Sequence, residues 1–250
     1  MNRFSSENIL VVGACSEIGT AIAHGLVREG ARVTLSGRSR GALEQLQRLI
    51  GDQASIAVCD LSDETARGKL LADSAAVTGK FSGMVYVAGF HRLMPLGPGY
   101  GASLTQHLAI NVHAPLDLIK DFSSRHNSDD TRQRSVTVIA SIAHLLGEPA
   151  LSAYSASKGA MVSAVRALAV EFARKNIRIN SLSPGWVMGD SADRVAGKIP
   201  VGTHEKIVST YPLGFGVPTD VAEAVMYLAS PGARWVTGID LVIDGGRTCV

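Results

Sequence analysis

Tyr154 and Lys158 lie at positions i and i+4 of a stretch that is expected to be helical, Ala153–Arg174, so their side chains share one face. A phenol has a reference pKa of about 10 and is a poor acid or base near neutrality. A neighbouring ammonium favours the phenolate and lowers that pKa. The pair therefore predicts a tyrosine that exchanges a proton with a carbonyl or alcohol oxygen. The alternative is a half-buried ring beneath a lysine stem.

Ser141 is a second candidate for this chemistry, because it directly follows a predicted strand, Val136–Ala140. Its hydroxyl could hydrogen-bond the same substrate oxygen and hold it for hydride transfer. A Tyr–Lys pair alone is a weak signal. Its occurrence together with Ser141 and with a glycine-bearing turn upstream favours a catalytic function.

That turn runs from Gly13 to Gly19, between a predicted strand, Ile9–Val12, and a predicted helix, Ile18–Val27. A helix that opens from such a turn offers free backbone N–H groups and the positive end of its dipole, and both suit a pyrophosphate. Gly13 permits the tight turn, and Gly19 allows the helix to pack closely on the strand. The turn indicates a dinucleotide site, although the same residues could form an ordinary β–α connection.

Arg38 follows the second predicted strand, at the place where an acidic residue binds the ribose 2′-hydroxyl in NAD-binding folds. Here Gly37 leaves space and Arg38 offers a planar cation for a 2′-phosphate, which predicts NADP(H) rather than NAD(H). Alternatively, Arg38 and Arg40 only begin a solvated helix. Asp60, after the third strand, could accept from the adenine amino group or could cap the next helix with Ser62.

The elements that must position these residues alternate between short apolar runs and helical patterns. This alternation predicts an α/β fold, a Rossmann-like doubly wound parallel sheet of about seven strands with helices on both faces. The strands are expected at Ile9–Val12, Val33–Leu35, Ser55–Val58, Met84–Val87, Val136–Ala140, Ile177–Leu182 and Ile239–Ile243. The helices are expected at Ile18–Val27, around Leu43, Leu46 and Leu49, and at Thr65–Ala76, Leu104–Phe122, Ala153–Arg174 and Val221–Ala229.

No linker or repeat divides the chain, so residues 1–250 are expected to form a single dinucleotide-binding oxidoreductase domain. Ser123–Ser135 is polar and is expected to be a surface loop. Residues 189–216 are rich in Gly and Pro and are expected to form a mobile lid.

The composition excludes several other classes of protein. With 46% hydrophobic and 18% charged residues, a mainly disordered chain is not expected. A formal net charge of +2 and an aromatic content of 5% give no nucleic-acid footprint. The three cysteines match neither a zinc site nor a disulfide framework, and the polar N-terminal residues match neither a signal peptide nor a membrane span. We expect a cytoplasmic protein without a metal site.

In order and spacing, the chain resembles the short-chain dehydrogenase/reductase family in its single-domain form, from about Asn8 to Gly246. The matching motifs are Gly13-xxx-Glu17-Ile18-Gly19, Asp60-Leu61, Ala88-Gly89, Asn111-Val112, Ser141, Tyr154-xxx-Lys158, Asn180-Ser181-Leu182-Ser183-Pro184-Gly185 and Thr237-Gly238-xxxxx-Asp244-Gly245-Gly246.

The resemblance implies a catalytic tetrad of Asn111, Ser141, Tyr154 and Lys158. In this tetrad Tyr is the general acid and base, Lys lowers its pKa and holds the nicotinamide ribose, Ser orients the substrate oxygen, and Asn holds a water that relays protons. Taken without the resemblance, Asn111 could equally cap or bend a helix. The residues assigned to the cofactor are Gly13, Cys15, Ser16, Glu17, Ile18, Gly19, Arg38, Asp60, Leu61, Ala88, Gly89, Tyr154, Lys158, Pro184, Gly185 and Val187.

Four places depart from the family's usual pattern, which has Thr at Val12, Gly at Glu17, Asn-Asn at Tyr86-Val87 and Thr at Gly189. These departures leave the tetrad intact and are expected to bear on cofactor affinity. A carboxylate at position 17 is unfavourable beside a phosphate, although at a helix N-terminus it could point outward and favour the dipole. Any support that Asn gives the central strand must come from another residue.

Substrate contacts are expected on the loops after strands four, five and six, because ligands of open α/β sheets lie beyond the carboxyl ends of the strands. The candidates are His91, Ala143, His144, Leu145, Trp186 and Met188. The set is mostly apolar and, with Arg92 nearby, suits a hydrophobic substrate that carries an anionic group. Each histidine could instead have a packing or surface role.

Two surfaces could bind other proteins. A loose set of basic residues borders the fifth and sixth predicted strands: Arg132, Arg134, Arg174, Lys175 and Arg178. In related 3-oxoacyl-acyl-carrier-protein reductases, basic residues in this region meet an acidic carrier protein. Here Asp129 and Asp130 weaken that hypothesis, and a solvated surface is preferred. Small residues on the Ala153–Arg174 helix predict a homodimer or homotetramer, with burial inside one chain as the alternative. They are Ala156, Gly159, Ala160, Ser163 and Ala167.

Together these features predict an NADP(H)-dependent enzyme that reduces a small-molecule ketone to a secondary alcohol by hydride transfer. Two alternatives stay open. One is an alcohol dehydrogenase that runs in the oxidising direction, which the same groups would serve. The other is a non-catalytic dinucleotide-binding protein, which Glu17, Val87 and Gly189 favour and the complete tetrad opposes.

Overall fold

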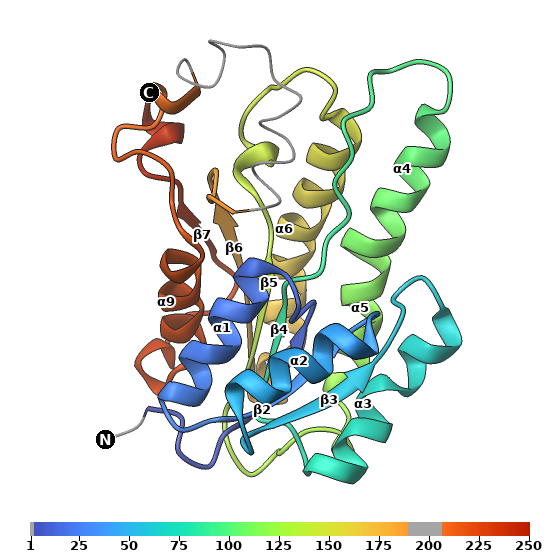
Figure 1. The fold of residues 1–250 in the computed structure, drawn as a ribbon, viewed down its shortest axis with the longest axis vertical. Helices are drawn as coiled ribbons and strands as arrows, with labels where there is room; N and C mark the ends of the chain where they lie inside the picture. Colours follow the sequence, from blue (N-terminus) through green and yellow to red (C-terminus); the bar gives the residue numbers. More distant parts are fainter. Residues whose placement is uncertain (1–2, 190–206) are drawn as a thin grey trace.

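The computed structural model describes residues 3–189 and 207–250. Its sheet has seven strands, all paired in parallel, in the order β3-β2-β1-β4-β5-β6-β7 (Figure 1). The strands are β1 (Asn8–Val12), β2 (Arg32–Gly37), β3 (Ala54–Val58), β4 (Gly83–Tyr86), β5 (Arg134–Ile139), β6 (Ile177–Pro184) and β7 (Asp240–Ile243). The predicted fold class is confirmed.

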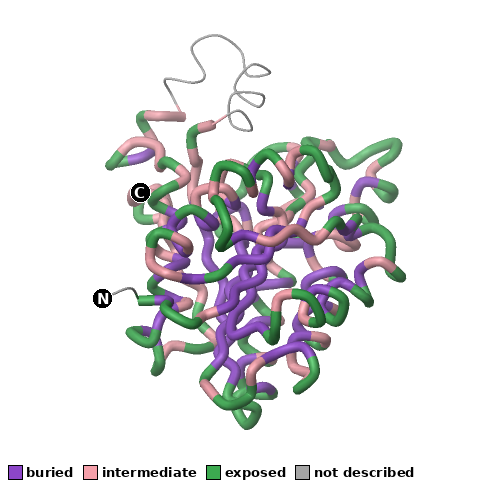
Figure 2. The backbone as a smooth tube through the Cα atoms, turned by 60° about the horizontal axis from the view of Figure 1, so that its bottom comes forward, coloured by how far each residue is buried: buried purple, intermediate pink, exposed green. Residues whose placement is uncertain are grey.

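Both faces of the sheet are covered by helices, so the fully buried strand β1 contributes to two hydrophobic cores. Ile9 and Val11 lie in the core with α1 (Glu17–Arg28), α2 (Arg40–Ile50) and α9 (Pro218–Ala229). Leu10 and Val12 lie in the core with α3 (Glu64–Thr78), α5 (Ala114–Phe122) and α6 (Ser152–Ala173). Successive side chains of a strand point to opposite faces, which explains why β1 is an unbroken apolar run. Figure 2 shows the buried strands in the middle of the molecule.

The predicted helix Leu104–Phe122 is wrong as a single element. It divides into α4 (Tyr100–Leu108), a π-helical turn (Ala109–His113) and α5. Pro115 has no N–H to donate to the carbonyl of Asn111, so the regular ladder cannot continue there. The N–H of Ala114 instead reaches back to the carbonyl of Ala109, and the helix widens for one turn.

The predicted surface loop Ser123–Ser135 is wrong at its C-terminal end. Arg134 and Ser135 begin β5 and are buried, as is Ser128. The Arg134 guanidinium donates to the Ser128 hydroxyl at 2.6 Å, which satisfies part of its charge inside the protein. Leu49 is a smaller correction, since it is 69% exposed whereas its predicted helix partners Leu43 and Leu46 are buried.

The basic set is also less solvated than predicted. Arg178 is buried and donates to the carbonyls of Val236 and Ser230 at 3.2 and 3.3 Å. Arg134 is buried as described above. These two side chains are therefore structural, because a buried guanidinium must find acceptors inside the protein.

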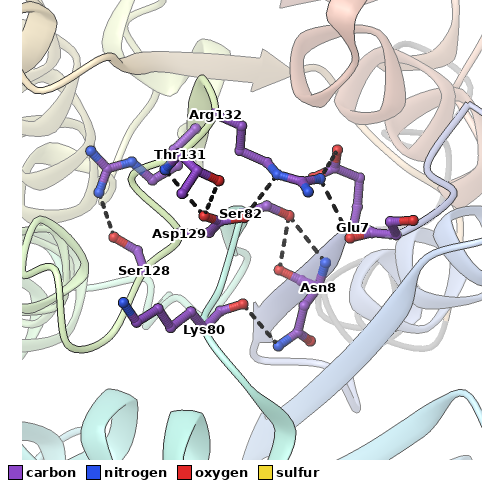
Figure 3. A network of polar contacts seen from close by, with 10 residues as sticks. Glu7, Asn8, Lys80, Ser82, Ser128, Asp129, Thr131 and Arg132 are labelled. Atoms are coloured by element: carbon purple, nitrogen blue, oxygen red, sulfur yellow. Dashed lines mark hydrogen bonds and ion pairs between the residues drawn. The ribbon is translucent and has the colours of Figure 1, made fainter.

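A polar network holds the amino ends of β1 and β4 together (Figure 3). The backbone N–H of Asn8 donates to the Ser82 hydroxyl at 3.0 Å, and its side-chain amide donates to the Lys80 carbonyl at 3.3 Å. Arg132 pairs with Glu7 at 3.1 Å and with Asp129 at 2.8 Å. Since all strands are parallel, this network holds their amino ends together, and a site can form at their carboxyl ends.

Of the predicted lid at 189–216, residues 190–206 lie outside the described residues. At its far end, the N–H of Gly216 donates to the carbonyl of Trp186 at 3.0 Å, so residue 216 lies against the loop after β6. No helix in the described ranges combines the length and apolarity needed to cross a bilayer.

Candidate active site

A cavity of about 730 Å³ lies at the carboxyl ends of β1, β2, β4, β5 and β6. The strand order reverses between β1 and β4, and such a reversal opens the crevice in which doubly wound folds bind ligands. Its volume lies within the usual range for small-molecule sites. The cavity brings together residues from both ends of the sheet.

Ser141, Tyr154 and Lys158 all line this cavity. Ser141 follows β5 and caps a short 3₁₀ turn (Ile142–His144), whereas the other two lie in the first turns of α6. The Tyr154 phenol and the Ser141 hydroxyl are hydrogen-bonded. The Lys158 ammonium lies 5.7 Å from the centroid of the Tyr154 ring and donates to the carbonyl of Ile139 at 2.7 Å.

Asn111 lies behind the cavity lining, on the π-helical turn, and is buried. Its amide oxygen accepts from the Phe90 N–H at 2.7 Å, and its NH₂ donates to the Phe90 carbonyl and the Ser157 hydroxyl, both at 2.9 Å. The amide therefore holds the chain after β4 against α6. A β-carbon at Gly89 would lie 3.5 Å from the Lys158 nitrogen and 3.6 Å from the Asn111 oxygen, so both residues flank Gly89.

The titration of the central pair is set by burial. Burial raises the pKa of Tyr154, and the hydrogen bond with Ser141 opposes that rise. Burial lowers the pKa of Lys158 to about 8. The pKa of Tyr154 thus lies above its ordinary value, because the effect of burial exceeds that of the hydrogen bond with Ser141.

Replacing Lys158 is expected to change how stability depends on pH. Because the Lys158 pKa falls from 10.5 to about 8 on folding, between these values the unfolded chain binds a proton that the folded chain does not. The free energy of unfolding of the wild type should therefore rise, relative to Lys158→Met, by on the order of 3 kcal/mol as the pH increases through this window.

Urea unfolding of the ligand-free proteins at pH values below and above the window measures this difference. Lys175→Met removes an exposed lysine and serves as the control. An identical pH dependence of Lys158→Met and the wild type would contradict the buried, depressed amine.

The turn after β1 fits a phosphate-bearing group. The Ser16 hydroxyl caps α1 by accepting from the Gly19 N–H at 3.1 Å and donates to the Gly13 carbonyl at 2.9 Å. A β-carbon at Gly13 would lie 2.6 Å from the Ala88 nitrogen, and one at Gly19 would lie 2.4 Å from the Gly13 oxygen. Both positions therefore require glycine, and the turn can lie against the start of α1.

Most residues assigned to a cofactor meet at the cavity, and two do not. Glu17 and Gly19 lie outside the lining, while their neighbours are part of it. The assigned residues that line the cavity are Gly13, Cys15, Ser16, Ile18, Arg38, Asp60, Leu61, Ala88, Gly89, Tyr154, Lys158, Pro184, Gly185 and Val187.

Arg38 and Asp60 lie at the end of the cavity formed by β2 and β3. Asp60 accepts from the N–H and the hydroxyl of Ser62 at 2.9 and 2.7 Å; these bonds, and the nearby Arg38 charge, lower its pKa. The cap of α3 is Asp63, so Asp60 closes the preceding turn instead. Arg38 precedes α2, whose cap is Ser39.

The predicted substrate residues are only partly brought together. His91 and Trp186 line the cavity, and the His91 ring packs edge-on against Tyr154 at 4.7 Å between centroids. Ala143, His144, Leu145 and Met188 do not line it. His144 is directed elsewhere: its Nε2 lies 3.1 Å from an Asp240 oxygen and 3.2 Å from the Ser183 hydroxyl.

Two kinds of contributor were missed from the sequence. Tyr86 replaces the usual Asn, and its hydroxyl donates to the Ile110 carbonyl at 2.6 Å, which anchors the π-helical turn to β4. Gln106 and Ile110 line the cavity from one face of that helix. Their i, i+4 spacing next to Asn111 was an available signal.

Comparison with known proteins agrees with this geometry. Residues 13–248 match the family model described as enoyl-(acyl carrier protein) reductase. The chain is 30% identical to 2-(S)-hydroxypropyl-CoM dehydrogenase 3 of Xanthobacter autotrophicus, over 100% of the chain and 99% of that protein. It is 30% identical to 3-oxoacyl-acyl-carrier-protein reductase of Rickettsia conorii, over 100% of both.

A solved structure is also similar over most of its length. It is a 7α-hydroxysteroid dehydrogenase complexed with NADH and 7-oxoglycochenodeoxycholic acid, with a TM-score of 0.90 and 27% identity over 98% of this chain and 95% of that one.

The chain belongs to the short-chain dehydrogenase/reductase family. It is an oxidoreductase that acts on alcohol and ketone groups, and it belongs to a family that binds a nicotinamide dinucleotide.

Proposed function

We propose that this protein is an NADPH-dependent reductase that converts a ketone into a secondary alcohol. The observation that carries this proposal is the meeting of Ser141, Tyr154 and Lys158 at one wall of a cavity whose other parts carry the phosphate turn and Arg38. A reduced nicotinamide, when bound, supplies the hydride. The residues of this chain supply the proton and hold the substrate oxygen.

Tyr154 is the proposed general acid, giving its phenolic proton to the carbonyl oxygen of the substrate. Burial raises the pKa of Tyr154 and so keeps the phenol protonated, which is the form that a proton donor requires. Ser141, bonded to the same phenol, orients the substrate oxygen. The Lys158 ammonium, 5.7 Å from the ring, stabilises the phenolate that remains. Asn111 positions the chain after β4.

Arg38 supports NADPH as the cofactor. It is exposed, and it lines the cavity at the end of β2 together with Gly37. A guanidinium there offers charge-assisted hydrogen bonds to a 2′-phosphate. Asp60, which also lies in this part of the cavity, is available to the adenine.

The direction of the reaction is the first alternative. The same groups serve oxidation of an alcohol, in which the phenolate of Tyr154 accepts the proton that the phenol gives in reduction. Reduction is the proposed direction, and assays of ketones with NADPH and of alcohols with NADP⁺ compare the two. A non-catalytic dinucleotide-binding protein is the second alternative, and the assembled Ser141, Tyr154 and Lys158 argue against it.

A screen of substrates tests the proposal. The apolar rings of Phe90 and Trp186 at the cavity suggest ketones with a hydrophobic body, tested with and without an anionic group. Consumption of NADPH with at least one ketone is expected, and the product should be the secondary alcohol. NADPH binding without turnover of any ketone or alcohol would favour the non-catalytic alternative.

The remaining expectations stay proposals. We propose one dinucleotide-binding domain over residues 1–250, a cytoplasmic protein, and a homodimer or homotetramer formed through α6. The small residues Ala156, Ala160, Ser163 and Ala167 are exposed on α6, which supports contact with a second copy rather than burial in one chain. A carrier-protein partner has less support, since Arg134 and Arg178 are buried.

A further inference from the structure

Glu17 and Gly189 are far apart in the sequence and meet at the phosphate turn. Glu17 is the first residue of α1, and Gly189 follows the β6 loop that lines the cavity through Pro184–Val187. A β-carbon at Gly189 would lie 2.5 Å from Oε2 and 2.6 Å from Cδ of Glu17. The Glu17 carboxyl group therefore occupies the space that a side chain at position 189 would need.

The contact with Gly189 holds the negative charge of Glu17 beside the cavity lining rather than in it. Ser16 and Ile18, on either side of Glu17, line the cavity, whereas Glu17 does not. The N–H groups at the start of α1 attract anions, and a dinucleotide would place its pyrophosphate there. A carboxylate that turned into this region would repel the pyrophosphate.

We propose that Gly189 is a seat for the Glu17 carboxylate, and that this matched pair positions the acidic side chain outside the pyrophosphate site so that the enzyme can bind its dinucleotide. This inference rests on the proposed function, because it assumes a dinucleotide in the cavity. Gly189 is the positioning residue, since it acts through Glu17 and is not part of the cavity lining.

Any side chain at position 189 should displace the carboxylate. Because a glutamate is flexible, the clash is relieved by rotation of Glu17 rather than by movement of the backbone. Since Ser16 and Ile18 on either side of Glu17 line the cavity, we expect the displaced charge to lie closer to the pyrophosphate site. The harm done by a substitution at position 189 is then electrostatic and depends on the charge of residue 17.

A double-mutant cycle separates this effect from strain. Gly189 has φ +147°, so Gly189→Ala also has a backbone cost, but that cost is the same whichever residue stands at position 17 and cancels in the cycle. Glu17→Gln keeps the size of the side chain and removes its charge. The four proteins are the wild type, Gly189→Ala, Glu17→Gln and the double variant, and the readout is the Kd for NADPH from its fluorescence.

Gly189→Ala should weaken NADPH binding about tenfold when Glu17 is present and about twofold in the Glu17→Gln background. The larger loss should shrink as salt is added, because ions screen the displaced carboxylate. Binding of 2′-AMP, which has no pyrophosphate, should not change. Gly51→Ala is the matched control, since Gly51 also has a positive φ, of +94°, with open space around it.

The inference would be overturned if Gly189→Ala weakened NADPH binding equally in the two backgrounds, or if it weakened 2′-AMP binding in parallel. Either result would indicate that the substitution distorts the cavity rather than moving a charge. These outcomes leave the proposed function standing if the wild type binds NADPH and reduces ketones. A wild type that binds neither NADPH nor NADH would overturn both.

Discussion

Tyr154→Phe is expected to lower kcat for ketone reduction by about 10² to 10⁴, the usual contribution of a positioned general acid. The substitution removes the phenolic oxygen and retains the ring, which packs against His91. The Kd for NADPH should therefore stay within about twofold of the wild-type value. Steady-state kinetics and NADPH fluorescence titration measure the two quantities on the same protein.

Tyr227→Phe makes the same chemical change at a residue of α9 that is 45% exposed, and it should leave kcat unchanged. Near-normal turnover by Tyr154→Phe would refute the role given to this residue. Loss of NADPH binding together with loss of turnover would instead indicate that the phenol supports the cavity.

Arg38→Asp is expected to reverse the preference between the two dinucleotides. The wild type should have a higher kcat/KM with NADPH than with NADH, because the guanidinium would bind the 2′-phosphate. An aspartate would repel that phosphate and could accept a hydrogen bond from the ribose hydroxyls of NADH. The ratio of the two kcat/KM values should change by about 10² or more, since a charge-assisted hydrogen bond is lost and a repulsion is gained.

Arg40→Asp is the matched control for this change in charge. Arg40 is exposed, lies in the first turn of α2 and has Glu44 at 4.0 Å. Its substitution should alter both cofactors alike and leave their ratio close to that of the wild type. A wild type that prefers NADH would show that Arg38 only precedes the helix.

The departures from the family pattern illustrate what could not be read along the chain. Glu17 and Gly189 each depart from the family pattern, but their contact depends on the packing of α1 beside the loop after β6. At position 86, where Tyr replaces the family's usual Asn, the hydroxyl donates to the carbonyl of Ile110 on the π-helical turn. Both contacts join residues that are distant in the sequence.

The residues that contact the substrate were the least predictable part of the site. His144 was expected to face a substrate because it follows β5, and the structure pairs it with Asp240 of β7. This partner is available only because β7 lies beside β6 in the sheet, which no local pattern reveals. The position of a residue on a loop therefore showed that it lies at the carboxyl ends of the strands, but not where its side chain points.

Features that depend on local geometry could be predicted from the residues alone. The alternation of apolar runs and helical patterns specified seven strands in their order along the chain, and the four-residue spacing placed Tyr154 and Lys158 on one helix face. The approach of Ser141 to Tyr154 and the pKa shifts of Tyr154 and Lys158 could not be predicted in this way and follow from the assembled fold. The physical reason is that a titration depends on burial and on partners from other elements, and both arise only when the sheet and its helices are assembled.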